Sequence, residues 1–409
     1  MRSAPLDARL RARSPSVGAS VLGVALGLLC AALVLVLYRR HGDERAAARP
    51  ALLASASGVV ADDAGPLREI VMHYVPELER SFAATYRDFL GTLPRETHIV
   101  MVIRRGHRAR LDAFLGGLEG GAALVSRMRV VEIDAPLGIW SKDRALVLTP
   151  LGNEKQSKIE LVVPPRTKPG EGSRPMDWDI VPAVAAALPA SFDVRQIPIA
   201  FDAGDFAIAG KRVVFDVNLF ARNRARSYRS PQELRERLKG LFGRDVVMLG
   251  SEVGDVPRHH MSMYMAVLDG STALVGDPEA GARIVGRDYE PGERSPETGQ
   301  PLRADFSKET VARFDRAASD LAAAGFRVVR IPTVAFDDKT YFAYTNGVYE
   351  TRDGKRTAWM PSFGHAPLDA AARAIYEQLG WSVHPIAVRD VYAQHGTIGC
   401  MVNVVSRGE

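Results

Sequence analysis

Segments with helical spacing of apolar residues alternate along this chain with short, continuously apolar segments typical of buried strands. Residues 98–103 (His-Ile-Val-Met-Val-Ile) predict such a strand, residues 107–118 a helix, and residues 129–133 another strand. Further helix–strand pairs follow at 231–242 with 245–249, 309–324 with 327–331, and 368–379 with 382–386. This order predicts an α/β architecture built from repeated modules.

Three other segments of the globular region have their own patterns. Residues 66–93 alternate apolar and charged side chains at helical spacing, so we expect a helix there. Residues 164–175 and 289–301 are rich in Pro, Gly and charged residues, which predicts two long surface loops. The whole chain has 409 residues, 46% of them hydrophobic, which is enough for one large or two medium domains.

Residues 17–38 contain no charged side chain and are long enough for a membrane-spanning helix. A cleaved signal peptide is the alternative, but Arg39 and Arg40 follow the apolar run and no small-x-small site ends it. A lipoprotein site at Cys30 is disfavoured because Leu29 precedes it. The expected parts are a basic tail at 1–16, a single-pass transmembrane anchor at 17–38, a linker at 39–66 and a globular domain at 67–409.

The net charge is concentrated at the N-terminus. Residues 1–50 hold eight Arg and three acidic residues, which accounts for the entire formal charge of +5. The remaining residues carry 45 basic and 45 acidic side chains, so we expect no nucleic-acid partner. The four Arg before residue 17 favour a cytoplasmic N-terminus and an extracytoplasmic domain, whereas Arg39 and Arg40 on the other flank oppose this orientation.

Cys400 is the lone thiol of the globular region, because the second cysteine, Cys30, lies in the apolar run. It has no partner for a disulfide within that region. Two interpretations follow: a small buried apolar side chain, or a nucleophile whose His and carboxylate partners lie far away in the sequence.

Polar residues gather in three segments next to predicted strands: Gly138–Arg144 (Gly-Ile-Trp-Ser-Lys-Asp-Arg), Phe201–Phe206 (Phe-Asp-Ala-Gly-Asp-Phe) and His259–Tyr264 (His-His-Met-Ser-Met-Tyr). Taken singly, each has an ordinary interpretation: an Asp in a turn, a hairpin, or a histidine satisfied in the core. No His-Glu-x-x-His pattern and no cysteine pair occur, so we expect no metal site.

In this order and spacing, the segments resemble the guanidino-group-modifying (pentein) superfamily over residues 95–405. Trp140-Ser141-Lys142-Asp143 is similar to its Trp-x-Arg-Asp segment, and Asp202-Ala203-Gly204-Asp205 to the acidic motif of amidinotransferases. His260-Met261-Ser262 aligns with His-x-Asp. The closing segments of the superfamily are matched by Tyr344-Thr345-Asn346, Pro361-Ser362-Phe363-Gly364 and Gly396-Thr397-Ile398-Gly399-Cys400.

The resemblance implies a five-bladed α/β propeller of αββαβ modules around a pseudo-fivefold axis. It implies Cys400 as the nucleophile, His260 as the general acid and base, and Asp202 as the carboxylate that orients His260. Substrate contacts are implied for Trp140, Asp143, Asp205 and Ser262. The substrate would be a small guanidino compound or an arginine side chain, attacked through a covalent thiouronium, and no cofactor is implied.

Two residues depart from the superfamily pattern. Ser262 stands where a second guanidinium-binding Asp is usual, and Gly399 where a His often precedes the nucleophile. Loss of a charge-assisted contact costs about 1.5–3 kcal/mol. Three outcomes stay open: a differently substituted guanidine or amidine substrate, compensation by Asp205 or Asp255, or a non-catalytic relative. The functions to weigh are therefore a deiminase-type hydrolase, an amidinotransferase, and a non-catalytic binding domain at the membrane.

Overall fold

The computed structural model describes residues 57–59, 62, 65–150, 159–165, 177–188, 192–209, 212–224 and 228–408. The predicted tail and transmembrane segment, residues 1–38, lie outside these ranges, as does most of the loop expected at 164–175. Within the described ranges, no helix has the length and apolar character needed to cross a bilayer. The compact unit described below comprises residues 55–409.

The described strands include five sheets with one common pairing pattern. In each sheet two strands pair antiparallel, and the second of them pairs parallel with a third. The sets are β5 (Leu146–Pro150), β6 (Ile159–Val163) and β7 (Phe192–Gln196); β8 (Phe206–Ala209), β9 (Arg212–Asp216) and β10 (Asp245–Leu249); β11 (Met265–Leu268), β12 (Thr272–Asp277) and β13 (Arg327–Pro332); β16 (Val348–Arg352), β17 (Lys355–Ser362) and β18 (Trp381–Ala387); and β19 (Asn403–Arg407), β2 (Leu67–Tyr74) and β3 (His98–Arg104).

Further strands extend this pattern. β1 (Ser57–Val59) pairs with β5, β4 (Met128–Ile133) pairs with β3, and β14 (Val334–Ala335) forms a small ladder with β15 (Tyr341–Phe342). Because β19 pairs with β2, the last and one of the first described strands share a sheet. Cys400 lies just before β19, so this pairing brings the segment that contains Cys400 next to β2 near the start of the domain.

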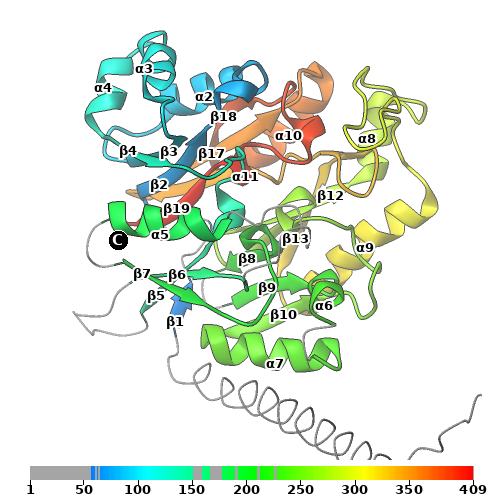
Figure 1. Cartoon of the computed structure of the whole chain (residues 1–409). Coiled ribbons are helices and arrows are strands. Elements are labelled where there is room, and N and C mark those ends of the chain that lie inside the picture. The colour runs from blue at the N-terminus through cyan, green and yellow to red at the C-terminus, as the bar shows by residue number, and fades with distance from the viewer. Residues whose placement is uncertain are drawn as a thin grey trace, which may run out of the picture. The chain divides into compact units, whose positions relative to one another are not determined.

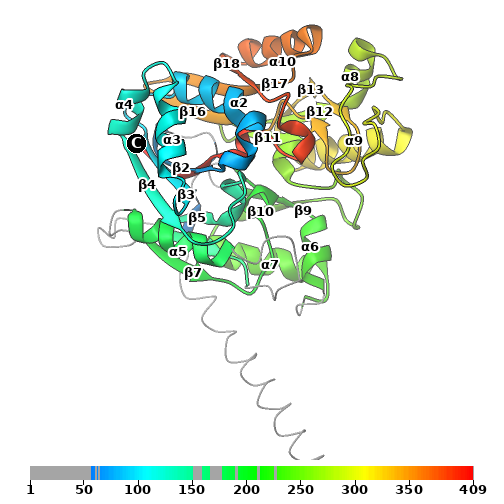
Figure 2. The same cartoon turned by 45° about the horizontal axis from the view of Figure 1, so that its top comes forward.

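Helices connect the parallel strands of every set. These crossovers are α2 (Glu79–Thr92), α5 (Asp177–Ala187), α6 (Asn218–Asn223) with α7 (Pro231–Phe242), α8 (Pro278–Val285) with α9 (Lys308–Ala323), and α10 (Ala366–Gln378). Two more, α3 (Arg108–Gly116) and α4 (Gly121–Ser126), join β3 to β4, and the short α11 (Ile398–Met401) precedes β19. Figure 1 shows α7 running along β10, and Figure 2 shows α3 beside the β2–β3–β4 sheet.

The apolar strand and helix faces form the core between these elements. One large cluster joins β2, α2 and β3 to β17, α10 and β18, with Trp359 and Tyr86 fully buried in it. Phe342 stacks on Phe363 within the same cluster, with ring centroids 4.5 Å apart. Burial of this apolar surface stabilises the frame that carries the loops described below.

The α/β class expected from the sequence is confirmed, and the shared pairing pattern agrees with repeated modules. Their arrangement as five propeller blades around one axis stays a prediction. One expectation was wrong in detail. The helix expected over 66–93 begins only at Glu79, because Leu67–Tyr74 finds strand partners in β3 and β19. The linker expected at 39–66 stays a prediction, and β1 falls within that range.

Candidate active site

A cavity of about 790 Å³ brings together polar residues from loops that follow several different sheets. Six of the seven residues singled out in the sequence line it: Trp140, Asp143, Asp202, Asp205, His260 and Cys400. These residues are far apart along the chain, so only the tertiary fold places them in one cavity.

Trp140 and Asp143 lie in the turn between β4 and β5. Ser141 anchors this turn, because its buried hydroxyl lies 2.8 Å from the carbonyl oxygen of Val71 and 2.6 Å from that of Met401. A β-carbon on Gly396 would lie 2.6 Å from the Trp140 ring, so the loop that leads to Cys400 packs directly on that indole. Trp140 therefore forms a wall against which the loop before Cys400 is placed.

Asp202 caps the start of a short 3₁₀ helix, Ala203–Asp205, and Asp205 ends it; each carboxylate accepts from the backbone N–H of the other residue. Arg222 of α6 binds both of them: its Nη1 is 3.0 Å from Asp202 Oδ2, and its Nη2 contacts Asp205 Oδ2. The Asp205 carboxylate thus accepts hydrogen bonds from its own turn and from Arg222, while the Asp202 carboxylate also contacts His260.

His260 lies between two carboxylates and is 5% exposed. Its Nδ1 is 3.5 Å from Asp143 Oδ1, and its Nε2 is 3.4 Å from Asp202 Oδ2. Burial lowers the pKa of His260, but Asp143, Asp202 and the neighbouring Cys400 outweigh it and raise that pKa to about 10. At neutral pH this imidazole is therefore a cation that can donate a proton.

Cys400 is 2% exposed and lies in α11, which continues directly into β19. The side-chain amide of Asn346 donates to its Sγ at 3.0 Å. Gly399, the departure noted in the sequence, has a steric reason: a β-carbon there would lie 2.1 Å from Asn346 Oδ1. The position that is often His in the superfamily is thus closed to any side chain by Asn346.

Ser262 is not among the residues that line this cavity. It lines a separate small cavity of about 40 Å³ together with Lys142, Gly399 and Arg407. Its backbone carbonyl accepts from Thr345 Oγ1 at 2.9 Å. Ser262 lies within the 3₁₀ helix Met261–Met263, which follows His260. The substrate contact implied for Ser262 stays a prediction, which its place in this second cavity does not support.

Three further residues of the site carried no role in the sequence interpretation: Asn346, Asp216 and His259. Asp216 ends β9 and lines the main cavity; its carboxylate accepts from the Tyr264 hydroxyl at 2.7 Å and from the backbone N–H of Asn218. Burial raises the pKa of Asp216 to about 6, although these hydrogen bonds oppose the shift. The sequence signal that could have identified Asp216 is a carboxylate at the end of the apolar segment 212–216.

The cavity wall also includes side chains from three loops. Glu297 comes from the loop expected at 289–301, and its Oε1 lies 2.6 Å from Lys339 Nζ and 3.8 Å from His395 Nε2. All three residues line the cavity. The long loop between α8 and α9 thus contributes to this cavity, together with the loop before Cys400.

No protein-family model and no curated protein matches the chain. Several solved structures match the chain. Agmatine deiminase from C. jejuni has a TM-score of 0.59 at 12% identity, with 85% of this chain and 95% of that chain covered. Agmatine deiminase of Enterococcus faecalis gives the same four values. The C. jejuni enzyme in a variant with substrate bound has a TM-score of 0.60 at 11% identity, with the same coverage. The chain therefore has the pentein fold of the agmatine deiminases, as the order of its motifs implied.

Proposed function

We propose that this protein is a cysteine-dependent hydrolase of the deiminase type that acts on a guanidino C–N bond. The observation that carries the proposal is His260, held between Asp143 and Asp202 in the same cavity as Cys400. A buried cationic acid, a thiol nucleophile and carboxylates for a planar cation are the groups that this reaction needs. The pentein fold adds support, because its neighbours named above are agmatine deiminases.

The reaction divides between Cys400 and His260. The Cys400 thiolate forms a C–S bond with the guanidinium carbon, the C–N bond to the leaving amine breaks, and the proton of His260 passes to that amine. Water then adds to the carbon of the bound thiouronium, and His260 accepts a proton from it. The C–S bond breaks, which restores the thiolate and releases a ureido product. Asp143 and Asp202 stabilise the cationic form of His260 before the first proton transfer.

Ser262 stands where the superfamily usually has a second guanidinium-binding Asp, and we propose that Asp216 takes this role. Ser262 lies outside the main cavity, Asp205 is engaged by Arg222, and Asp255 accepts from Ser251 and from the backbone of Glu252. Asp216 lines the cavity, and its carboxylate accepts from the Tyr264 hydroxyl and the backbone N–H of Asn218, both uncharged donors. A bound guanidinium would add a positive charge beside it and favour its ionised form.

The first test is covalent labelling of the full-length protein by 2-chloroacetamidine, an amidinium that carries a leaving group. Chloroacetamide, its neutral analogue, measures the ordinary reactivity of the same thiol, and Cys400→Ala with peptide mapping separates Cys400 from Cys30. Labelling of Cys400 at least tenfold faster by the amidine supports a working cation site. Equal rates with both reagents refute it and leave a non-catalytic binding domain.

A second assay identifies the reaction. Agmatine and L-arginine are supplied, and ammonia and the ureido product are measured with the wild type and with Cys400→Ala. Release of ammonia that depends on Cys400 supports hydrolysis. Transfer of the amidino group to an added amine, without ammonia release, would instead make the protein an amidinotransferase.

A further inference from the structure

His259, the residue before the proposed general acid, has a backbone conformation that histidine seldom adopts. Its φ is +83°. In the described part of the chain, the other non-glycine residues with positive φ are Asp269, Asp353 and His395. The two aspartates occupy exposed turns, whereas His259 and His395 both line the active-site cavity. Strained residues of this kind persist where the surrounding structure holds them, often at functional sites.

The side chain of His259 contacts His260 and the loop that leads to Cys400. Its ring is stacked on that of His260, with centroids 4.5 Å apart and planes 15° apart. Its Nε2 lies 2.7 Å from the carbonyl oxygen of His395, so this nitrogen carries the hydrogen and donates. His395 starts the loop that runs through Gly396 and Thr397 to Cys400. His259 is therefore a direct bridge between the His260 ring and the nucleophile loop.

The electrostatic state of the two histidines differs. Burial lowers the pKa of His259 well below the usual range, and the neighbouring His260 lowers it further. The neutral ring of His259 thus stacks on the cationic ring of His260 without adding a second positive charge. Gly204 also approaches His260: a β-carbon on it would lie 2.7 Å from the imidazole Cγ and Nδ1. His260 has little freedom to rotate between these neighbours.

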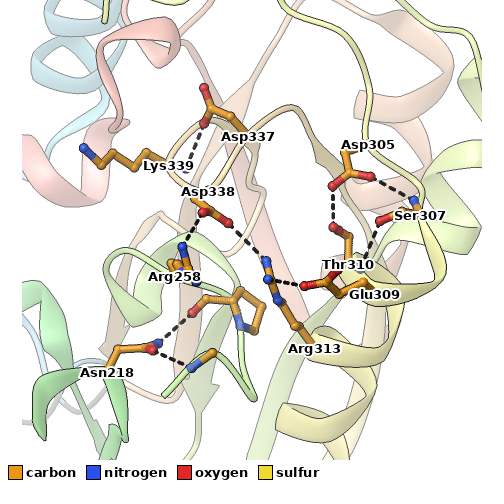
Figure 3. A network of polar contacts seen from close by, with 12 residues as sticks. Asn218, Arg258, Asp305, Ser307, Glu309, Thr310, Arg313, Asp337, Asp338 and Lys339 are labelled. Atoms are coloured by element: carbon orange, nitrogen blue, oxygen red, sulfur yellow. Dashed lines mark hydrogen bonds and ion pairs between the residues drawn. The ribbon is translucent and has the colours of Figure 1, made fainter. Parts of the chain in front are cut away.

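The segment before His259 is anchored by the polar network in Figure 3. Asn218 Nδ2 donates to the carbonyl of Pro257 at 3.2 Å. Outside the residues drawn there, the Tyr341 hydroxyl donates to the carbonyl of Arg258 at 3.1 Å. Arg258 Nη1 lies 2.8 Å from Asp338 Oδ2. This anchoring accounts for how the left-handed conformation at His259 is maintained, because the backbone on its N-terminal side is held in place.

We propose that His259 is a positioning residue that aligns the His260 imidazole with the Cys400 sulfur through its stacked ring and its hydrogen bond to the nucleophile loop. The inference rests on the proposed function of the same site. A histidine that merely fills space would affect folding stability, whereas a positioning residue changes the rate of reaction at Cys400 in the folded protein. Misplacement of a reacting group by about 1 Å costs on the order of 100-fold in rate.

The test compares His259→Gly with Asp353→Gly in the full-length protein. Both substitutions place glycine at a positive φ, but Asp353 lies in an exposed turn outside the cavity. The maximal rate of Cys400 labelling by 2-chloroacetamidine (kinact) and its half-saturating concentration (KI) are measured, with circular dichroism as the check on folding. We expect kinact to fall about tenfold or more in His259→Gly with KI changed less than twofold, and both constants to stay at wild-type values in Asp353→Gly.

An unchanged kinact in folded His259→Gly overturns the inference. If that variant does not fold, His259→Asn decides in its place, because asparagine tolerates positive φ and keeps an N–H donor but lacks the ring. Failure of the proposed function has a different signature: the wild type then reacts equally with the amidine and with chloroacetamide. In that case the rate of Cys400 labelling by chloroacetamide tests the inference. A tenfold fall in His259→Gly relative to the wild type supports the positioning role, and a rate equal to that of the wild type refutes it.

Discussion

Gly399→Ala tests the close packing of the turn that carries Cys400 against Asn346. Gly399 is a helical residue of α11, so the intrinsic preference for alanine in helices predicts stabilisation by up to about 1 kcal/mol. The tertiary contacts predict the opposite. The new β-carbon would lie 2.1 Å from Asn346 Oδ1 and 2.9 Å from the carbonyl oxygens of Asn346 and Gly347, whereas ordinary contacts begin at 3.4 Å.

The size of the effect follows from which atoms can yield. The Asn346 side chain is fully buried and donates to Cys400 Sγ and Met263 Sδ, so it moves only by giving up these contacts. The two carbonyls belong to backbone, and that of Asn346 also accepts from Thr397 Oγ1 at 2.8 Å. Overpacking of this kind costs typically 1–3 kcal/mol, and we expect about 3 kcal/mol because backbone must shift.

Urea unfolding measures the stability, and 2-chloroacetamidine labelling measures the state of Cys400. Gly91→Ala in α2 is the matched control, because it also adds a methyl group to a helix and meets nothing within 4 Å. We expect the control to be as stable as the wild type or slightly more so, and Gly399→Ala to lose both stability and labelling rate. Equal stability of Gly399→Ala and the wild type would refute the packing argument.

Three other outcomes are expected. Asp143→Asn removes the contact that most raises the pKa of His260, so this pKa should fall and the alkaline limb of the pH–activity profile should move to lower pH. The pKa of His260 is about 10 in the folded protein and 6.5 for a free histidine. The stabilisation from protonated His260 is therefore complete below pH 6.5 and is lost as pH rises through 10. Urea unfolding should show this decline in the wild type, and His260→Gln should lack it. Residues 17–38 are proposed to anchor the chain with its domain outside the cytoplasm, so the full-length protein should stay in the membrane fraction at alkaline pH and a variant without these residues should not.

Local patterns were sufficient where an element depends on its own residues. The helix expected at 231–242 has the same bounds in the structure, and it begins with a Ser230 cap followed by Pro231, two local signals. The strand at 245–249 was also placed correctly. By contrast, residues 67–74 had helical spacing of apolar and charged residues but form β2, because pairing with β3 and β19 outweighs that local pattern.

The site divides in the same way. Motif order singled out Asp143, Asp202, His260 and Cys400, and the structure brings all four to one cavity. Motif order could not show that Asn346 contacts the Cys400 sulfur or that Ser262 lines a different cavity. These contacts depend on the relative placement of loops from separate sheets, which no local spacing reports.

The sequence by itself thus determined the α/β class and several helix–strand pairs, and it singled out the residues for which a chemistry is proposed, because periodicity and residue type are local properties of the chain. The tertiary structure alone decided which side chains meet: His260 between two carboxylates, Asn346 against Cys400, and His259 against His260. Proximity of a few ångströms between residues far apart in the chain is a property of packed sheets and their connecting loops, and it exists only once the core holds them together.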